Sequence, residues 1–301
     1  MRKNILVIYY SQSGQLKEIT SNLTQPLSEN NYDVDFYQIQ PEVDYDFPWK
    51  PKEFYGAFPE SFKQIPIAIN PPPMAILEKE YDLVIFAYQI WFLTPSIPAN
   101  SFLKSEYAKQ LLNNKKVITV IGCRNMWAKA QQKTKVLIEE AGGELVGNIA
   151  FVDKHLNHIS VITIVHWVMG GKKTRKFGVF PKPGVSDEDI NGASKFGELI
   201  LQVDKESRYE TLQDGIIKLG GAGLRSFIVF MDETANKMFD KWSSLILRKK
   251  EKRALFLSFF KAYLLIAIWL VSPIVYIVFL LTYPLRMKKI KAKKIYYSGV
   301  T

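Results

Sequence analysis

Short apolar runs alternate with helical patterns through residues 1–203, and this alternation restricts the chain to few folds. Residues 4–10 and 81–88 are too short for helices and rich in β-branched and aromatic residues, as in strands buried on both faces. Residues 34–39 alternate as a strand does, and 116–122 and 145–152 are the other two predicted strands. Helical spacing or capping residues mark the stretches 16–27, 96–112, 127–141 and 186–202. This order predicts an α/β fold whose parallel sheet is covered on both faces. For five strands we predict the doubly wound order 2-1-3-4-5, with ligands at the carboxyl edge.

Residues 41–80 stand where an alternating fold would have its second helix. Prolines punctuate this stretch and aromatic residues lie between them, so we expect an ordered insertion rather than a flexible linker. We divide the chain into an α/β domain, an amphipathic connector, and a hydrophobic anchor with a basic tail: 1–203, 204–253 and 254–301. The first of these also contains an apolar extension over 154–182.

The net charge of +11 belongs to the C-terminal part of the chain. From Lys241 onward thirteen Lys and Arg residues accompany one acid, Glu251, a balance of +12, which leaves about −1 for residues 1–240. The nearly neutral domain has no electrostatic footprint for nucleic acid, so we expect no nucleic-acid partner. The basic excess brackets the most apolar stretch, which is typical of a segment that contacts membrane lipid.

A single cysteine, Cys123, excludes a disulfide framework and a cysteine-based zinc site. The only other conceivable metal ligands in sequence proximity are Asp153, His155 and His158, and we expect no metal there. The apolar run that begins the chain is too short for a secretory signal and no small-residue cleavage site follows it. We therefore expect the domain to stay in the cytoplasm.

The loop after the first predicted strand has the sequence Ser11-Gln12-Ser13-Gly14-Gln15-Leu16 and leads into a helix. Small hydroxylated residues and a glycine allow backbone N–H groups at a helix N-terminus to surround a phosphate. The loop lacks the Lys-Ser/Thr of a nucleotide-triphosphate loop and the G-x-G-x-x-G of a dinucleotide fold. We interpret it as a phosphate-binding loop; the alternative is an ordinary strand–helix turn.

Two further loops follow predicted strands at the same edge of the sheet. Residues 88–98 are rich in aromatic side chains, which stack on planar rings, and residues 122–127 offer Arg124 or Asn125 to bond a flavin carbonyl and Trp127 to cover a ring face. The alternative is a core cluster under the insertion. Together with the phosphate loop, they predict an FMN site formed by Ser11, Ser13, Gly14, Gln15, Leu16, Gln89, Ile90, Trp91, Phe92, Leu93, Gly122, Arg124, Asn125 and Trp127.

Histidines and an apolar stretch follow the last predicted strand. We take His155 and His158 as candidate catalytic residues that transfer a proton, with structural hydrogen bonding as the alternative. Residues 159–169 are apolar but too short to span a bilayer. We expect them to line an apolar substrate channel or to enter the membrane interface.

Residues 262–285 carry no charge and are long enough to span a bilayer. Both flanks are basic, and the positive-inside rule would place both in the cytoplasm, which a single span cannot satisfy. Because Pro273 follows Ser272 in mid-segment, we hypothesise a re-entrant or monotopic hairpin at this pair rather than a single span. In either case residues 254–285 anchor the chain at the cytoplasmic face of the inner membrane.

Four segments resemble the dialkylresorcinol condensing enzyme family, flavodoxin-like proteins of flexirubin-type (aryl polyene) pigment clusters in secondary metabolism: residues 5–16, 86–98, 123–127 and 152–167. The resemblance runs over nearly the whole chain, anchor included. It implies a flavodoxin-like fold and FMN, with the phosphate loop at Ser11, Ser13 and Gly14 to Leu16. The hydroxyl common at the last loop position is replaced here by Leu16, which leaves one phosphate donor fewer.

The resemblance also implies an activity. A partner ketosynthase would make a cyclic diketone with two alkyl chains, and this chain would be the flavin-dependent oxidoreductase that aromatises it. Such a lipophilic substrate suits a membrane anchor. Two alternatives stay open: a membrane-bound NAD(P)H:quinone reductase, and a non-catalytic assembly partner of the ketosynthase.

Overall fold

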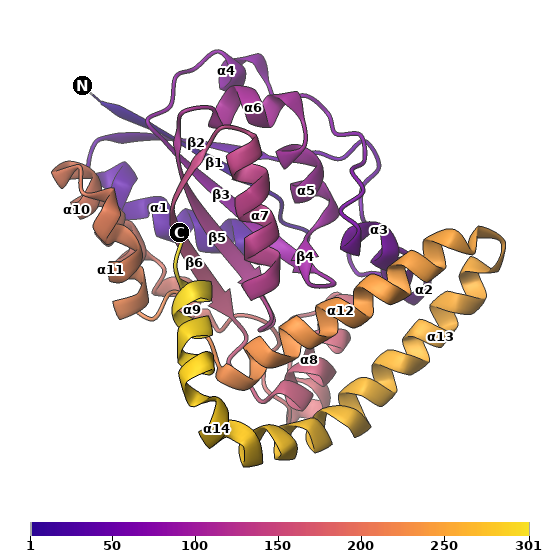
Figure 1. Ribbon diagram of the computed structural model, residues 1–301. Helices are drawn as coiled ribbons and strands as arrows, with labels where there is room; N and C mark the ends of the chain where they lie inside the picture. The colour runs from indigo at the N-terminus through magenta and orange to yellow at the C-terminus, as the bar shows by residue number, and fades with distance from the viewer. Residues whose placement is uncertain (1, 301) are drawn as a thin grey trace.

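A computed structural model describes residues 2–300 and shows a parallel sheet with helices on both faces (Figure 1). The five parallel strands have the order β2-β1-β3-β5-β6, which is the predicted doubly wound order 2-1-3-4-5 and confirms the flavodoxin-like fold. Their bounds are β1 Lys3–Tyr9, β2 Tyr32–Gln38, β3 Leu83–Trp91, β5 Lys116–Cys123 and β6 Glu144–Val152. The central strands are buried on both faces, as their continuous apolar runs require.

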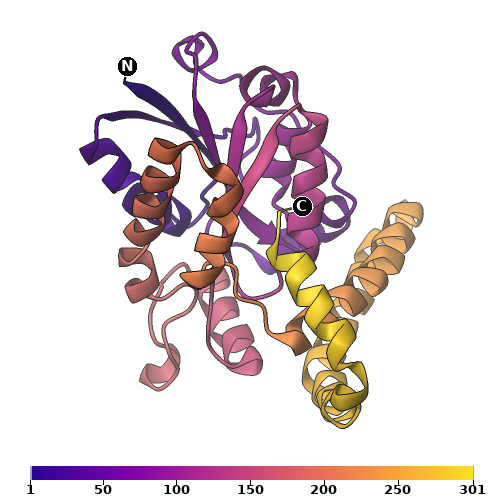
Figure 2. The ribbon, with the colours of Figure 1, turned by 60° about the vertical axis from the view of Figure 1, so that its left-hand side comes forward.

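Helices from different parts of the chain cover the two faces of the sheet (Figures 1 and 2). One face is covered by α1 Gln15–Glu29, α9 Asp187–Asn191, α10 Ser194–Glu206 and α11 Leu212–Lys218, with the short η2 Tyr209–Thr211 before α11. The other face is covered by α5 Ile97–Leu103, α6 Glu106–Leu112 and α7 Ala128–Glu140. Both layers leave the carboxyl ends of the strands to loops.

Two of the predicted helices are interrupted in the structure. The stretch 96–112 forms α5 and α6, because the chain turns at Lys104 and the Ser105 hydroxyl accepts a hydrogen bond from the Ala108 N–H (3.4 Å) to begin a new helix. The stretch 186–202 forms α9 and α10, which are separated by Gly192 and Ala193. Helical periodicity continues across both breaks, so the sequence pattern did not reveal them.

A sixth strand, β4 Thr94–Pro95, pairs antiparallel with the end of β3 and was not predicted. The two residues between them, Phe92 and Leu93, have φ values of 49° and 65°. Two consecutive positive φ angles are the backbone requirement of a tight hairpin turn, which side chains larger than glycine or asparagine adopt only at a cost of about 1–3 kcal/mol each. This turn projects the aromatic end of β3 beyond the sheet.

The insertion at 41–80 and the extension at 154–182 both contain helices. The insertion forms α2 Pro51–Gly56, α3 Phe58–Phe62 and α4 Met74–Leu77, and the extension forms α8 Asn157–Gly170 and the short η1 Lys176–Gly178. The two segments touch where the backbone N–H of Trp49 donates to the Val168 carbonyl (2.8 Å). α8 and the first part of the insertion lie at the carboxyl edge of the sheet, whereas α4 lies at the opposite edge, where β3 begins (Figure 1).

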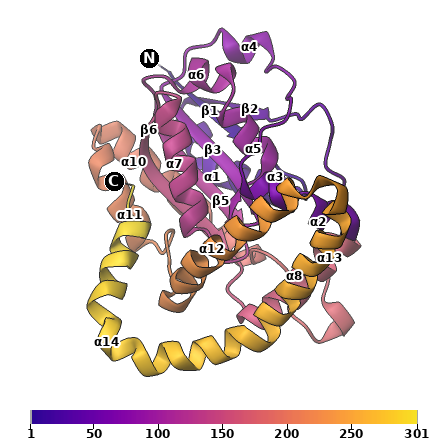
Figure 3. The same ribbon diagram turned by 45° about the vertical axis from the view of Figure 1, so that its right-hand side comes forward.

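The remaining helices form a C-terminal arm, which we define as residues 226–298. Its parts are α12 Ser226–Arg248, η3 Lys250–Lys252, α13 Arg253–Ile266, the π-helical turn η4 Ala267–Val271 and α14 Ser272–Ser298. Figure 3 shows that α12 runs away from the sheet, α13 turns back, and α14 curves toward the domain again. The continuous helical segment Lys250–Ser298 is long enough and apolar enough to cross a membrane, as judged by its length and composition.

The hairpin expected at Ser272-Pro273 is not formed, because the helix continues through Pro273. The π-helical turn directly before it accommodates the missing N–H, so the backbone curves instead of reversing. The far end of the arm is attached to the domain, because the Gln213 amide donates to the Ser298 carbonyl (2.6 Å). Within the arm, the Tyr297 hydroxyl of α14 donates to Glu233 of α12 (2.9 Å).

A buried carboxyl group links α12 to the domain and predicts a pH effect. Burial raises the pKa of Asp232 to about 6, although the Lys129 N–H donates to it (3.0 Å) and Lys133 lies nearby. A carboxyl group with a raised pKa destabilises the folded state as the pH rises past its unfolded pKa toward its folded pKa. Wild type should therefore lose stability relative to Asp232→Asn as the pH rises. The difference in the free energy of unfolding between the variant and wild type should increase by up to about 3 kcal/mol from pH 4 to pH 7.

Denaturant titrations of both proteins at several pH values within this range measure that difference. In the wild type this range ends below the pKa of Lys133, which burial lowers to about 8. A difference that does not change with pH would contradict the assignment to Asp232.

Candidate functional site

A cavity of about 260 Å³ lies at the carboxyl edge of the sheet, where the three predicted loops converge. Its walls come from the loops after β1, β3 and β5, from the insertion and from α8. Nine of the fourteen residues proposed for the flavin site line it: Ser13, Gln15, Leu16, Gln89, Ile90, Trp91, Phe92, Gly122 and Arg124. Ser11 and Gly14 belong to the same phosphate loop but do not line the cavity, and Leu93 is buried beyond the hairpin turn.

The phosphate loop presents donors that the protein itself does not use. Gly14 precedes α1 with a φ of 84°, and no side chain caps the helix. Within the described residues, the only hydrogen bond from the N–H groups of residues 12–17 is the long one from Lys17 to the Ser11 hydroxyl (3.4 Å). Free N–H groups at a helix N-terminus favour an anion, so the loop fits the phosphate of FMN. Leu16 is buried and packs against Gly122.

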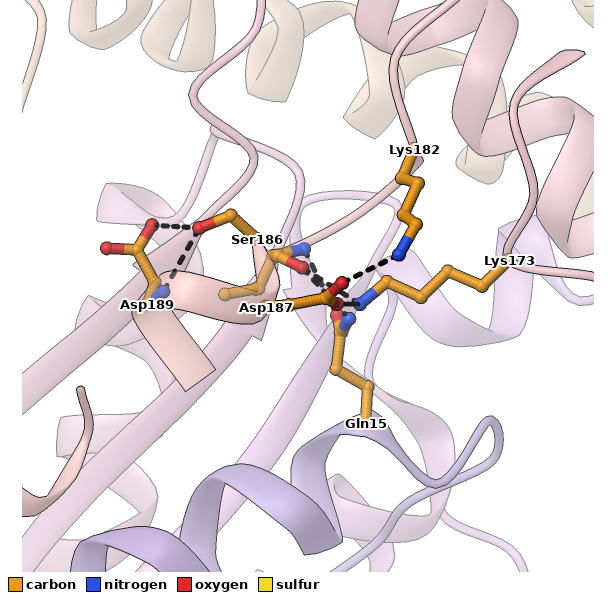
Figure 4. A network of polar contacts seen from close by, with 7 residues as sticks. Gln15, Lys173, Lys182, Ser186, Asp187 and Asp189 are labelled. Carbon is orange, nitrogen blue, oxygen red and sulfur yellow. Dashed lines mark hydrogen bonds and ion pairs between the residues drawn. The ribbon is translucent and has the colours of Figure 1, made fainter. Parts of the chain in front are cut away.

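A loop before α9 holds Gln15 in place (Figure 4). The Gln15 amide donates to the Val185 carbonyl (3.3 Å), and its oxygen accepts from the Val185 N–H (3.2 Å). Lys173 joins this carbonyl to Asp187 with contacts of 3.0 Å to each. Gly184 in the same loop has a φ of 78°, and a Cβ there would lie 2.6 Å from the Trp167 ring. The sequence analysis did not identify this loop.

Gln12 connects the phosphate loop to the insertion. Its amide donates to the carbonyls of Tyr45 (3.2 Å) and Asp46 (2.9 Å), and its oxygen accepts from the Trp49 indole N–H (2.9 Å). Gln12 also lines the cavity and is absent from the predicted site. In the sequence, only the position of Gln12 inside the phosphate-loop motif could have indicated that it belongs to the site, because its three bonding partners lie more than thirty residues away.

Aromatic side chains form another wall of the cavity. The Trp91 ring lies 4.9 Å from Tyr45, 5.1 Å from Trp49 and 6.0 Å from Tyr10, with all three neighbours edge-on. Phe92 packs on Phe54 at 5.0 Å. Edge-on neighbours fix the orientation of Trp91 at the cavity, which suits a planar ring system.

The end of β5 contributes a partly buried thiol, and the loop after it contributes a partly buried cation. Arg124 donates to the Asn157 side-chain oxygen (2.7 Å), and burial lowers its pKa while the Asp153 carboxylate opposes this shift. Burial raises the pKa of Cys123, so the thiol stays protonated and acts as a small apolar group. Asn125 also donates to Asn157 (3.0 Å) and does not line the cavity.

Trp127 was expected to cover a ring face, but it lies in the core with no exposed surface and outside the cavity. It directly precedes α7, whose packing on the sheet turns the indole inward. A sequence alone gives the loop's composition and not the direction of each side chain.

Neither candidate catalytic histidine lines the cavity. The His158 Nε2 lies 3.0 Å from the Ile268 carbonyl and its ring 5.3 Å from Trp269, because the first turn of α8 directs it toward the arm. The His155 N–H donates to Asp153 (2.9 Å). Among the described residues, the cavity lining includes no Asp, Glu or His, and no three His, Cys, Asp or Glu side chains are grouped to hold a metal.

The apolar stretch at 159–169 forms most of α8 and supplies an apolar wall of the cavity with Ile164, Val165, Trp167, Val168 and Met169. The same helix contacts the arm through His158. One helix thus lies between the cavity and the most apolar part of the chain.

No protein-family model and no curated protein matches the chain. Solved structures of similar fold include a Bacteroides eggerthii protein described as a flavoprotein (19% identity, 57% of this chain and 100% of that one, TM-score 0.39). They also include flavodoxin 1 from Bacillus cereus (15%, 65% and 95%, TM-score 0.36) and a flavone reductase (12%, 67% and 63%, TM-score 0.38). Similarity at this level concerns the fold alone, so the function rests on the geometry of the site.

Proposed function

We propose that this chain is a membrane-associated, FMN-dependent oxidoreductase that acts on a lipophilic ring compound. The observation that carries the proposal is the single cavity in which the phosphate loop, with its free N–H groups, meets an aromatic wall at the switch point of the sheet. A group of hydrogen-bond donors for a phosphate, beside an aromatic pocket for planar rings, matches the two ends of FMN.

We propose a place for each part of the cofactor. The N–H groups of residues 12–16 would hold the phosphate, Trp91 and Phe92 would flank the ring system, and Gln89 and Arg124 would bond its polar edge. When bound, FMN supplies hydride and electron transfer. Because no carboxylate or imidazole lines the cavity among the described residues, the protein's own part is to orient the ring, exclude water and place Arg124 beside developing negative charge.

Flavin binding is the first test. Purified full-length protein is titrated with FMN, and quenching of flavin fluorescence gives the stoichiometry and Kd. We expect one FMN per chain. A folded protein that neither carries flavin nor binds added FMN would exclude the oxidoreductase and leave the assembly partner of the ketosynthase.

We further propose that the substrate is the cyclic diketone of dialkylresorcinol synthesis. Aromatisation would convert a cyclohexanedione into a resorcinol by removing a hydride and a proton from the ring. Bound FMN would supply the hydride acceptor, and the proton would pass to solvent water. The support is the sequence resemblance over four segments, each of which contributes residues to the cavity lining: the phosphate loop, the loop after β3, the loop after β5 and α8. The apolar wall of α8 suits the alkyl chains.

Reconstitution with the partner ketosynthase tests this substrate. With the protein and FMN present, the ketosynthase product should lose two hydrogens, as followed by mass spectrometry. If the product is unchanged while the protein reduces quinones with NAD(P)H, the quinone reductase is the correct assignment.

We also propose that the arm lies in one leaflet at the cytoplasmic face of the inner membrane and does not cross the bilayer. Both ends of Lys250–Ser298 are attached to the same domain: Arg253 forms a two-contact ion pair with Glu60 (2.8 and 2.7 Å), and the Gln213 amide bonds the Ser298 carbonyl. The most apolar window between these ends is only 11% buried. Both basic flanks then stay on one side, as the positive-inside rule favours.

Cysteine labelling tests this topology, and the only native cysteine, Cys123, lines the flavin cavity and is not in the arm. Tyr296→Cys in the tail and Ser21→Cys on the domain should react equally with a membrane-impermeant maleimide when the protein is bound to the outside of sealed vesicles. Wild-type protein serves as the blank. Tail labelling that requires detergent, while the domain position is labelled without it, would show that the arm spans the bilayer.

A further inference from the structure

A second cavity, of about 450 Å³, lies between α12 and α14, away from the flavin site. It occurs where the charge-free stretch of the arm ends at Leu285 and the basic tail begins at Arg286. In a membrane-bound arm this is the depth at which lipid headgroups lie.

The polar part of this cavity has an excess of positive charge. Lys237, Arg286 and Lys289 line it, and none of them forms an ion pair with a residue that the structure describes. The one acid in the lining, Glu233, is already paired with Lys293 and accepts a hydrogen bond from Tyr297. Three uncompensated cations around one cavity are stabilised by an anion, and arginine and lysine together suit a phosphate group.

The other part of the cavity is apolar and continuous with the arm. Phe279 is nearly buried, with its ring 5.8 Å from Phe230 and 5.4 Å from Phe227. Phe230 and Phe279 line the cavity beside the basic residues, and the two residues that follow Phe279 in α14, Leu280 and Leu281, are exposed. A ligand that fills both parts must have a phosphate joined to an aliphatic chain.

We propose that the cavity between α12 and α14 binds the headgroup phosphate of an anionic phospholipid, with the acyl chains along the apolar face of α14. The inference rests on the proposed membrane association. It adds a specific lipid site to that association, because nonspecific attraction to an anionic surface would not depend on which basic residues supply the charge.

A matched pair of variants tests the site. Arg286→Gln/Lys289→Gln removes two charges from the cavity, and Arg248→Gln/Lys249→Gln removes the same two charges from the exposed end of α12, outside it. The full-length proteins are titrated by calorimetry with monomeric short-chain phosphatidylglycerol, short-chain phosphatidylcholine and inorganic phosphate. We expect wild type to bind one phosphatidylglycerol, and the cavity variant to bind it about 30-fold more weakly while the control variant is unchanged.

Three outcomes would overturn the proposal: equal affinity for both lipids, equal weakening in both variants, or inorganic phosphate binding as tightly as the lipid. Flotation with neutral phosphatidylcholine vesicles is measured in parallel. Loss of flotation by wild type would refute the membrane association itself, whereas retained flotation with no preference for phosphatidylglycerol refutes only the lipid site.

Discussion

Replacing Ser13 by aspartate is expected to weaken FMN binding by at least about 100-fold. The new carboxylate would lie beside the free N–H groups that precede α1 and would face the phosphate at short range. Repulsion of about 3 kcal/mol between such charges in a partly desolvated site corresponds to this factor. The fold itself should be preserved, because a carboxylate at a helix N-terminus is favourable.

Titration of flavin fluorescence with each purified protein measures this effect. The control is Ser28→Asp, which adds the same charge at the exposed far end of α1. We expect its Kd to remain within about twofold of wild type, since the position is several helical turns away and screened by solvent. If Ser13→Asp binds FMN as tightly as wild type, the phosphate does not lie at this loop.

Replacing Gly197 by alanine is expected to destabilise the domain by at least about 3 kcal/mol, the upper range for a misfit in a packed interior. Gly197 lies where α10 crosses α1, and a Cβ there would be 1.9 Å from the Leu23 carbonyl oxygen. The obstacle is helix backbone, so the two helices must move apart. The gain in helix propensity from glycine to alanine, about 1 kcal/mol, is too small to compensate.

Thermal and denaturant unfolding of the full-length protein measure the loss, and a decrease in Tm of roughly 6–12 °C is expected. Gly56→Ala is the matched control, because Gly56 also lies in a helix, as the last residue of α2, and a Cβ there would meet no atom within 4 Å. A Gly197→Ala protein as stable as wild type would show that α1 and α10 are not in such close contact.

The insertion and the arm connect the candidate site to the proposed membrane surface. Phe58 of α3 stacks on Phe260 of α13 at 3.7 Å, and both are fully buried. Neighbouring Phe54 and Phe92 belong to the cavity wall. The insertion therefore packs against the cavity on one side and against the arm on the other.

Local chemistry in the sequence was sufficient for the sheet and for the phosphate loop. Short apolar runs that alternate with helical patterns are typical of parallel strands covered on both faces, and five such strands favoured the doubly wound order. A glycine between small polar residues at the first strand–helix junction likewise indicated the loop, and Ser13 and Gln15 line the cavity. Charge distribution alone identified the apolar segment with its two basic flanks.

Tertiary structure decided everything that depends on which way a side chain points. Trp127 faces the core and His158 faces the arm, although both belong to loops or helices at the correct edge of the sheet. Gln12 belongs to the site because it bonds Trp49, more than thirty positions away in sequence. Gly184 belongs to it because its backbone lies against the Trp167 ring of α8. The course of the arm was decided in the same way, because the contacts that attach Ser298 to Gln213 are long-range and leave no periodic pattern in the sequence.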